Sequence, residues 1–347
     1  MSVLQILAIG DPHFKVDNAE ESEHFHHQVS RWLDDHPVDF IVILGDILHS
    51  HEKIYTFAMN TAVKFIKMCS TYAPVYCLVG NHDATSNTIY CSSNHWLKVL
   101  DGMDSNINIV EKPTFLTDSN VLCCPYVSDG RFIEMLEQYV DGWQDTDVIF
   151  AHQLFDGGKM GAIVANNVEK WNEAYPLIIS GHLHDRQQPQ TNLYYAGSSQ
   201  HLAFSESADK SLALVKVDDT DEKTKVTWEE IYLELKQRKT MYCSVEEVST
   251  IKLQANIQYK IVIKDEDATI KAFKKSGKYK ELQSHPQVRS VQFKLLQADK
   301  EEKAEFNNDF LTTLHAKLQA ENLYMQSYAN HLLTGSEDMS DKDVVLV

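Results

Sequence analysis

Three short apolar segments, each rich in Val or Ile and each ending in glycine, constrain the fold of this chain most strongly. They are residues 3–10, 39–45 and 74–80, and the stretches between them, 19–36 and 55–70, carry apolar residues at helical spacing. Apolar runs that alternate with amphipathic helices indicate βαβ units, in which helices cover the faces of a largely parallel sheet. The first part of the chain therefore predicts an α/β fold with a sheet covered on both faces.

Further strands are predicted along the chain, but fewer helices separate them, so we expect part of the second half to be antiparallel. After residue 243 the pattern changes to a small strand–helix–strand unit, followed by one or two amphipathic helices at 301–333 and a tail. We predict three parts with boundaries at 1–240, 241–300 and 301–347. The additional predicted strands are 106–110, 120–127, 147–152, 176–182, 192–197, 211–217, 225–235, 258–265 and 288–296, with a helix at 268–282.

The composition is that of a globular protein with an acidic excess: 43% of the 347 residues are hydrophobic and the net charge is −18. No apolar run approaches the roughly 20 residues of a membrane span, and the N-terminus lacks the features of a signal peptide. We therefore expect an intracellular protein, cytoplasmic or nuclear, that does not bind membranes. The acidic excess argues against a broad nucleic-acid-binding surface, although clustered metal-binding carboxylates would account for part of it. The six cysteines lack CxxC spacing, which predicts reduced, buried thiols.

Acidic, amide and imidazole side chains follow five of the predicted strands at the point where each ends. Each motif alone is weak, because a single histidine at a strand end is usually a capped or core residue. All five follow an apolar run, however, and the carboxyl ends of strands converge at one edge of an α/β sheet. The motifs are GDPH (Asp11, His13), GDILH (Asp46, His49), GNHD (Asn81, His82, Asp83), FAHQ (His152) and GHLHD (His182, His184).

Seven of these residues form a candidate ligand set that is too large for one tetrahedral metal site. The size of the set fits two metal ions that share a bridging ligand. In such sites the two ions stabilise the attacking oxygen and the leaving oxygen of a displacement at phosphorus. The mixture of carboxylate or amide oxygen with imidazole nitrogen suits borderline cations. We predict two divalent ions, with Mn first and Mg, Fe or Zn as alternatives. The predicted ligands are Asp11, His13, Asp46, Asn81, His152, His182 and His184.

With these motifs in this order, the chain resembles the calcineurin-like metallophosphoesterases. The resemblance implies a β-sandwich flanked by helices, with a small α+β capping domain and C-terminal helices. It assigns one metal to Asp11, His13, Asp46 and His184 and the other to Asp46, Asn81, His152 and His182, so that Asp46 bridges. It also implies that His82 is catalytic and contacts the scissile phosphate without binding a metal.

Within this superfamily the chain is most similar to the DNA double-strand-break repair nucleases, including SbcD-like and phage recombination endonucleases. His49 stands three residues after the bridging aspartate, as in that branch, and the segment 194–206, YYAGSSQHLAFSE, matches its pattern after GHxH. The resemblance implies a DNA nuclease in which His82 and His49 are catalytic. Its partners would be DNA, an SMC-like ATPase subunit and a second copy of the chain. It implies that 241–300 caps the site and binds DNA and that 301–347 binds the ATPase, and it is compatible with a viral or phage origin.

Two other functions stay open at this stage. A phosphomonoesterase or cyclic-nucleotide phosphodiesterase of the same superfamily is favoured by the acidic charge. A non-catalytic protein-binding scaffold is disfavoured, because a descendant without activity has no reason to keep all seven ligands. The lysines of the small unit fit either a solvated helix face or phosphate contacts. They are Lys271, Lys274, Lys275, Lys278 and Lys280.

Some conspicuous side chains are assigned to packing or surface positions. His24, His26 and His27 are expected on a helix surface, and Tyr55, Met59 and Met68 in the core or a dimer contact. The segment 306–333 has an apolar stripe that either binds a partner or packs on its own domain. That stripe comprises Phe306, Phe310, Leu311, Leu314 and Leu318.

Overall fold

The computed structural model describes residues 3–51, 53–161, 163–166, 168–207, 209–220 and 223–296. The predicted helices at 301–333, their apolar stripe and the tail lie outside the described residues. No helix in the described part of the chain is long and apolar enough to cross a membrane.

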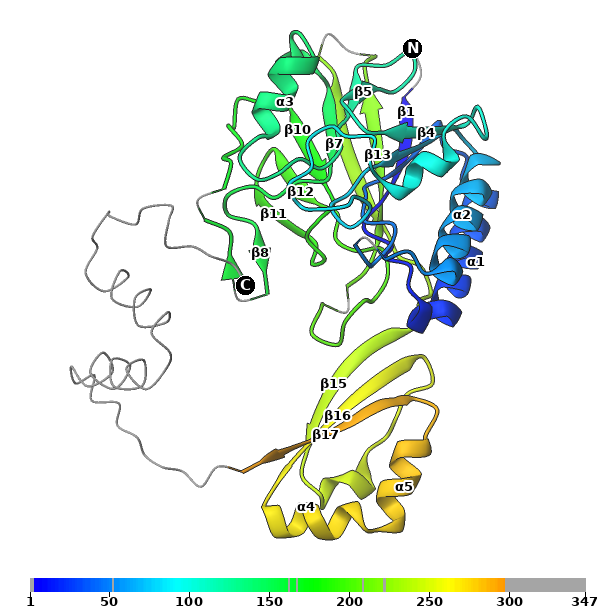
Figure 1. Ribbon diagram of the computed structural model, residues 1–347, viewed down its shortest axis with the longest axis vertical. Coiled ribbons are helices and arrows are strands. Elements are labelled where there is room, and N and C mark those ends of the chain that lie inside the picture. The colour runs from blue at the N-terminus through cyan, green and yellow to red at the C-terminus, as the bar shows by residue number, and fades with distance from the viewer. Residues whose placement is uncertain are drawn as a thin grey trace, which may run out of the picture. The chain divides into compact units, whose positions relative to one another are not determined.

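The first of two large sheets (Figure 1) is built mainly from the N-terminal part of the chain. Strands β1 to β4 run parallel to one another, whereas β13 pairs antiparallel with β1 and β14 antiparallel with β13. The partly antiparallel arrangement predicted for the second half is thus confirmed in this sheet. Its order is β14 (Lys225–Ile231), β13 (Leu212–Asp218), β1 (Leu4–Ile9), β2 (Phe40–Ile43), β3 (Val75–Leu78) and β4 (Ile107–Val110).

The second large sheet contains strands from the middle of the chain. Strands β6, β7, β10 and β12 are parallel, and the two edge strands β5 and β11 are antiparallel to their neighbours. Its order is β11 (Gln187–Gln190), β12 (Leu193–Tyr195), β10 (Leu177–Ser180), β7 (Val148–Ala151), β6 (Val121–Cys123) and β5 (Thr114–Phe115).

The two sheets pack face to face, so the fold is a sandwich rather than the single sheet that the strand–helix alternation suggests. Along β1, Ile6 and Ala8 belong to the apolar cluster between the sheets, together with Phe150 and Ile179 of the second sheet. Leu7, which points to the opposite face, packs under the helices. The mixed α/β sandwich agrees with the fold class predicted from the family resemblance.

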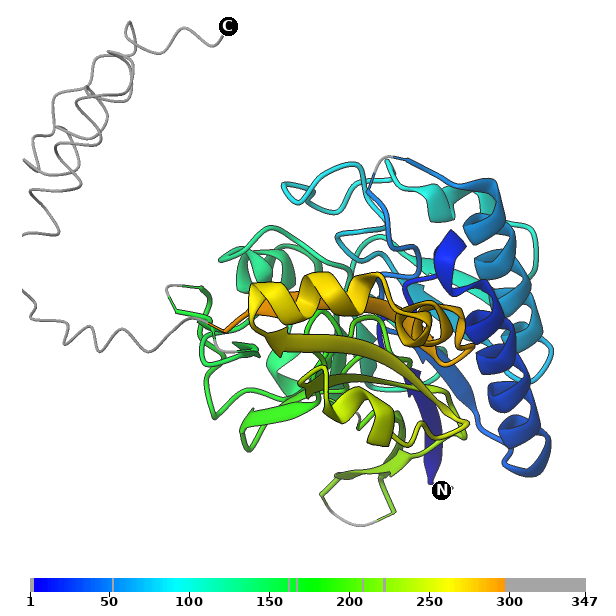
Figure 2. The ribbon, with the colours of Figure 1, turned by 90° about the horizontal axis from the view of Figure 1, so that it is seen from below.

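Helices cover the outer face of each sheet. On the first sheet, α1 (Ala19–Asp35) and α2 (Thr56–Ser70) lie side by side (Figure 2), and Phe25 and Phe65 bury their rings there. On the second sheet, α3 (Phe132–Tyr139) packs through Phe132 and Leu136 with Trp143 and Trp171. Short 3-10 turns occur at Val16–Asn18, Trp96–Leu100, Trp143–Asp145 and Glu247–Thr250. A two-stranded hairpin, β8 (Lys159–Met160) and β9 (Ile163–Val164), projects from the loop after β7.

The small C-terminal part is a three-stranded parallel sheet with helices on one face (Figure 1). Its strands, in order, are β15 (Gln237–Cys243), β16 (Ile257–Asp265) and β17 (Val288–Leu295). Two helices, α4 (Asp267–Lys274) and α5 (Gly277–Ser284), replace the single helix predicted at 268–282. The break is local in origin, because the Ser276 hydroxyl accepts a hydrogen bond from the Tyr279 amide and so caps a new helix.

Several side-chain predictions can be compared directly with this fold. All six cysteines are free thiols and all except the half-buried Cys91 are buried. His26 differs from the expected surface position, because its ring packs against Phe14 and Phe65. Met59 and Met68 pack against the core beneath α2, whereas Tyr55 is 52% exposed.

Candidate metal centre and active site

Loops from both sheets deliver the predicted site residues to one place. Asp11 and His13 follow β1, Asp46 follows β2, Asn81 and His82 follow β3, His152 follows β7, and His182 and His184 follow β10. The loops are bonded to one another: the His13 amide donates to the Asp46 carbonyl at 3.0 Å, and the His182 amide donates to Asp11 Oδ1 at 3.0 Å. The structure therefore brings all seven predicted ligands together, although they are spread over more than 170 residues.

The backbone is strained where these ligands lie. Among the described residues other than glycine, only six have a positive φ, and four of these are Asp11 (34°), His13 (45°), Asp46 (48°) and His182 (77°). Such conformations cost about 1–3 kcal/mol each and concentrate at functional sites. The strain therefore marks this strand-end cluster independently of its side-chain chemistry.

Glycines permit the close approach of these loops. A Cβ atom at Gly80 would lie 2.2 Å from the backbone nitrogen of Asp46, which no side chain tolerates. At Gly45, φ is +94° and a Cβ would lie 2.6 Å from Nδ1 of His152. The glycine in each of the GD and GN motifs is thus needed for the loops to meet.

Asp11, His13, Asp46 and His184 form the first of two adjoining groups. His13 Nε2 lies 3.5 Å from Asp46 Oδ2 and 3.0 Å from His184 Nε2. Because Nδ1 of His184 donates to Glu206 Oε1 at 3.0 Å, the other ring nitrogen is the one that faces the group. These four residues are the set that the family resemblance assigns to the first metal.

The second group contains Asp46, Asn81, His152 and His182. His152 is fully buried and donates from Nδ1 to the Leu44 carbonyl at 2.6 Å, which directs Nε2 toward Asp46 Oδ1 at 3.3 Å. Asn81 Oδ1 lies 2.9 Å from that same Nε2 and 3.0 Å from Nδ1 of His182. Asp46 belongs to both groups, as a bridging ligand must.

The chemistry of this cluster fits divalent cations. Asn81 Oδ1 lies 3.3 Å from both carboxylate oxygens of Asp46, so hydrogen-bond acceptors of the two side chains face each other without a donor between them. Asp11 Oδ2 and His13 Nδ1 are buried and have no hydrogen-bond partner among the described residues. Converging acceptors and unpartnered buried atoms of this kind are costly unless a cation lies between them. The donor set, with its mixed oxygen and nitrogen atoms, is one that such cations accept.

Burial and the neighbouring charges set the protonation states in the absence of a metal. Burial raises the pKa of Asp11 to about 7. Burial also opposes ionisation of Asp46, but the charges of His152, His13 and His82 and the hydrogen bond from His152 together outweigh burial and hold the pKa of Asp46 well below its usual value. Burial lowers the pKa of His13, and it lowers the pKa of His182 to about 3 with help from the charge of His152. His13 and His182 are therefore neutral and keep a lone pair for metal binding.

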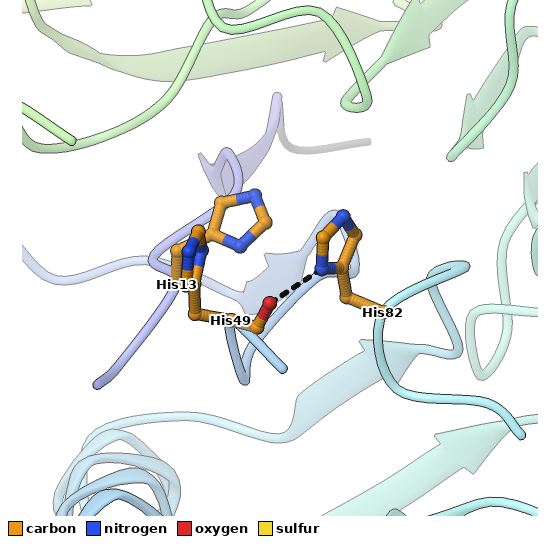
Figure 3. Close-up of side chains that lie close together, drawn as sticks. All are labelled: His13, His49 and His82. Carbon is orange, nitrogen blue, oxygen red and sulfur yellow. Dashed lines mark hydrogen bonds between the residues drawn. The ribbon is translucent and has the colours of Figure 1, made fainter. Parts of the chain in front are cut away.

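The two predicted catalytic histidines lie beside the first group. His82 donates from Nδ1 to the carbonyl oxygen of His49 at 2.6 Å, and the rings of His13, His49 and His82 gather around one space (Figure 3). The His82 amide donates to Asp46 Oδ1 at 2.8 Å, and its free Nε2 lies 3.9 Å from Asp46 Oδ2. His49 is the more exposed of the pair. Both are thus placed to meet a group that enters the site from solvent.

Comparison with known proteins agrees with this geometry. The sequence profile of the calcineurin-like phosphoesterases matches residues 4–186, more than half of the chain, including all five strand-end motifs. This chain belongs to the calcineurin-like phosphoesterase family. Members of the family are metal-dependent hydrolases of phosphate esters, so the chain is a metallophosphoesterase. The identity of its metal is a separate question.

Two viral proteins are similar to this phosphoesterase over most of its length. "Putative phosphoesterase 244L" of Invertebrate iridescent virus 6 is 39% identical over 282 residues, which are 80% of this chain and 99% of the viral protein. "Putative phosphoesterase 078R" of Invertebrate iridescent virus 3 is 35% identical over 287 residues, 80% of this chain and 81% of its own length. These relatives fit the expectation that a viral origin is compatible with the sequence.

Solved structures show weaker likenesses. The Pseudomonas putida nuclease MPE has a TM-score of 0.32 and 16% identity, and the match covers 60% of this chain and 83% of the nuclease. GAP50, the inner-membrane-complex anchor of Plasmodium, has a TM-score of 0.42 and 13% identity, covering 74% of this chain and 92% of GAP50. Likenesses of this size say nothing about the reaction.

Three further residues of this phosphoesterase hold the site in place. Asp83 accepts hydrogen bonds from the amides of Gly80, Ile47 and Leu48 and from the indole of Trp96. Glu206 holds the His184 ring and is itself paired with the buried Lys210 at 2.9 Å. Asp83 and Glu206 lie within two of the sequence motifs, GNHD and YYAGSSQHLAFSE. Their spacing from the predicted ligands, however, does not indicate that they support the site.

The leucine of GHLHD also has a clear place. Leu183 is 1% exposed and belongs to the apolar cluster beneath α3, while His182 and His184 face the site. The loop after β10, in which His182 adopts a positive φ, thus directs the two imidazoles to the site and the leucine to the core.

Proposed function

We propose that this metallophosphoesterase hydrolyses phosphodiester bonds in DNA with two divalent ions, as a nuclease. The observation that carries the proposal is that the imidazoles of His49 and His82 lie next to His13 of the first ligand group (Figure 3). His82 is fixed by its bond to the His49 carbonyl, so its Nε2 remains available to a substrate oxygen. His49 and His82 thus give the site two imidazoles in addition to the predicted ligands. Such a pair suits a substrate whose leaving oxygen must be protonated.

Each group has a distinct task in this proposal. Asp11, His13, Asp46 and His184 would hold one ion, and Asp46, Asn81, His152 and His182 the other. Bound divalent ions would act as Lewis acids on the phosphoryl oxygens and lower the pKa of the attacking water. When the anionic phosphate is bound, His82 would be protonated on both ring nitrogens; it would donate a hydrogen bond from Nε2 to the scissile phosphate and pass that proton to the leaving oxygen, which leaves a neutral ring still bonded to the His49 carbonyl. His49 would keep His82 in place through its carbonyl and present its ring to the leaving strand.

Charge favours a diester over a monoester. The nine residues of the predicted site include no arginine or lysine, and the nearby Lys210 is already committed to Glu206. A phosphomonoester carries up to two negative charges and gains from extra cationic side chains, whereas a diester carries one. The overall charge of −18, in contrast, favours the phosphomonoesterase or cyclic-nucleotide phosphodiesterase alternative.

A direct substrate comparison tests the proposal. The full chain, loaded with Mn, is incubated with linear duplex DNA, single-stranded circular DNA, bis(p-nitrophenyl) phosphate and p-nitrophenyl phosphate. We expect hydrolysis of DNA and of the chromogenic diester in preference to the monoester, and loss of all activity in Asp46→Asn. Preferential hydrolysis of the monoester with intact DNA would overturn the nuclease proposal and support the alternative.

We also propose a homodimer and an ATPase partner for the nuclease. Large apolar side chains around the start of α2 support the dimer, because Ile54, Tyr55 and Phe57 are each at least 50% exposed and lie within four consecutive residues. We expect a dimer in sedimentation velocity and a monomer for Tyr55→Asp/Phe57→Asp; a wild-type monomer would contradict the dimer. The segment proposed to bind the ATPase, 301–347, lies outside the described residues.

A further inference from the structure

The two faces of the small three-stranded sheet differ completely. One face packs against α4 and α5 through Tyr259, Ile261, Ile263 and Phe293. Because side chains alternate along a strand, the neighbouring residues Lys260, Val262 and Gln292 point to the opposite face. In the described part of the chain, α4 and α5 lie on one side of the sheet only and leave that face open (Figure 1).

The open face is basic, although the chain as a whole is strongly acidic. It carries Lys260, Lys264 and Lys294, together with Arg238, which is paired with Glu21 of α1 at 3.7 Å. The three strands place no acidic side chain on this face, since Asp265 follows the alternation of the helix-covered face. No carboxylate lies within 4 Å of the ammonium groups of Lys260, Lys264 or Lys294 among the described residues. Their charges are therefore available to a ligand that brings its own negative charge.

An exposed aromatic ring lies among these cations. Tyr242 is 59% exposed, and the Lys264 ammonium lies 4.7 Å from the centre of its ring. Basic side chains that follow a phosphate backbone, interleaved with an aromatic ring on which a base stacks, are the usual means of binding single-stranded nucleic acid.

A hollow connects this face with the loop that follows the GHLHD motif. The hollow has a volume of about 440 Å³ and is lined by Lys260, Lys294 and Tyr242 on the sheet side and by Ala203–Ser205 on the other. Thr240 Oγ1 donates to the Phe204 carbonyl at 3.1 Å, and Arg238 donates to the Leu202 carbonyl at 2.7 Å, so the sheet is attached to this loop.

A second hollow, of about 390 Å³, begins on the same loop and reaches the metal site. Ala203 and Ser205 line both hollows, and the second is also lined by Lys159, His182 and His184. Its two carboxylates are already bonded: Glu206 to His184 and Lys210, and Asp185 to the Ser207 amide. The two hollows therefore adjoin the same loop, one on the side of the predicted ligands and one on the side of the basic sheet face, and we call them together the path.

We propose that this path holds the single-stranded part of a nucleic acid substrate, with backbone phosphates at Lys260 and Lys294 and a base stacked on Tyr242. The inference rests on the proposed nuclease function and deepens it. It places the polynucleotide contacts of the small domain on its open sheet face, and not on the helices that carry Lys271, Lys274, Lys275, Lys278 and Lys280. Those five lysines are exposed but line neither hollow.

Matched charge reversals test the path. Lys260→Glu/Lys294→Glu changes two lysines of the path, and Lys278→Glu/Lys280→Glu makes the same change in net charge on α5. Binding of the full, EDTA-treated chain to fluorescein-labelled oligo(dT) is measured by anisotropy at several salt concentrations. We expect the first pair to weaken binding by a factor on the order of 10², and to reduce the slope of log K against log salt by about 1.4, because each single-strand phosphate contact contributes about 0.7.

Two further comparisons separate the path from its neighbours. Tyr242→Ala should weaken oligo(dT) binding roughly 10-fold, as loss of one stacked base does, and Tyr242→Phe should restore it. Both path variants should hydrolyse bis(p-nitrophenyl) phosphate at the wild-type rate, since that substrate is too small to reach the sheet. Circular dichroism confirms that the variants fold.

The possible failures are distinguishable. Equal losses from both lysine pairs, or no loss from Lys260→Glu/Lys294→Glu, would overturn the path while leaving the phosphodiester chemistry intact. Equal weakening for a duplex of the same length would overturn the single-strand assignment. If the wild type hydrolyses no diester, the proposed function fails, and oligo(dT) binding still decides whether the path exists.

Discussion

Asp83 offers the sharpest test of how the site is held together, because it supports the ligand loops without belonging to either ligand group. Its Oδ2 accepts a hydrogen bond from the Gly80 amide at 3.1 Å, and the Ile47 amide is shared between Oδ1 at 3.1 Å and Oδ2 at 3.2 Å. Its Oδ1 accepts from Leu48 and from the Trp96 indole at 2.7 Å. One carboxylate thus joins the loop after β2, which carries Asp46, to the loop after β3, which carries Asn81 and His82.

The substitution Asp83→Asn keeps the shape of the side chain and removes half of its acceptors. If the amide oxygen takes the place of Oδ1, the Ile47 amide keeps its bond to that atom, but the NH2 group faces the Gly80 amide hydrogen, so one bond to a charged acceptor is lost, at about 1.5–3 kcal/mol. Part of this loss is offset, because burial raises the pKa of Asp83 to about 6 and its ionised form is disfavoured. We expect a net destabilisation of about 1–3 kcal/mol.

Urea unfolding of the metal-free protein, followed by tryptophan fluorescence, measures this difference. Asp101→Asn is the matched control: Asp101 forms only a surface ion pair with Lys98 at 2.9 Å, with its side chain 59% exposed, so we expect a change below about 0.5 kcal/mol. Metal affinity of Asp83→Asn should also fall roughly 10-fold or more, as for other residues that orient ligands. A midpoint equal to that of the wild type, with unchanged metal affinity, would refute the role of Asp83 as the link between the loops.

Three other substitutions separate the predicted roles at the site. His82→Ala should retain both metals by elemental analysis and lower the turnover of the chromogenic diester by a factor on the order of 10² or more, whereas loss of metal would show that His82 is a ligand. Asp46→Ala should empty both sites, because Asp46 is the only residue shared by the two groups, and an occupied site in that variant would argue against the bridge. Glu206→Gln should weaken metal binding about 10- to 100-fold by titration calorimetry, since the His184 ring loses its charged partner and Lys210 its counter-ion. Unchanged affinity in Glu206→Gln would mean that packing alone orients His184.

Most of the large domain could be predicted from the sequence, because its strands are apolar runs that end abruptly. What the pattern could not give was the number of sheets. A strand covered by helices on one face and by a second sheet on the other is apolar on both faces, as is a strand between two helix layers. Leu7 and Ala8 illustrate this, since one packs under helices and the other against the second sheet. The sandwich followed only from the family resemblance.

Elements outside this pattern were harder to predict. The strand β15, QRKTMYC, has a polar face because that face stays uncovered, so it lacks the apolar run that marks a buried strand. The helix α3 is only eight residues long and was not predicted. The lysines that drew attention in the sequence are clustered on α4 and α5, whereas Lys260 and Lys294 are far apart in the chain and become neighbours of the same hollow only through the pairing of β16 with β17.

The site motifs could be found because they specify the backbone as well as the ligands. Asp11, His13, Asp46 and His182 all adopt positive φ without being glycine. At about 1–3 kcal/mol each, their combined strain is comparable with the net stability of a typical domain. No single loop could maintain such a conformation alone. The loops maintain it jointly, through the His13 amide on Asp46, the His182 amide on Asp11 and the His82 amide on Asp46. Since these bonds require close approach of the backbones, a glycine must precede each strained turn. The same few residues that are predicted to bind the ions therefore also join the loops to one another.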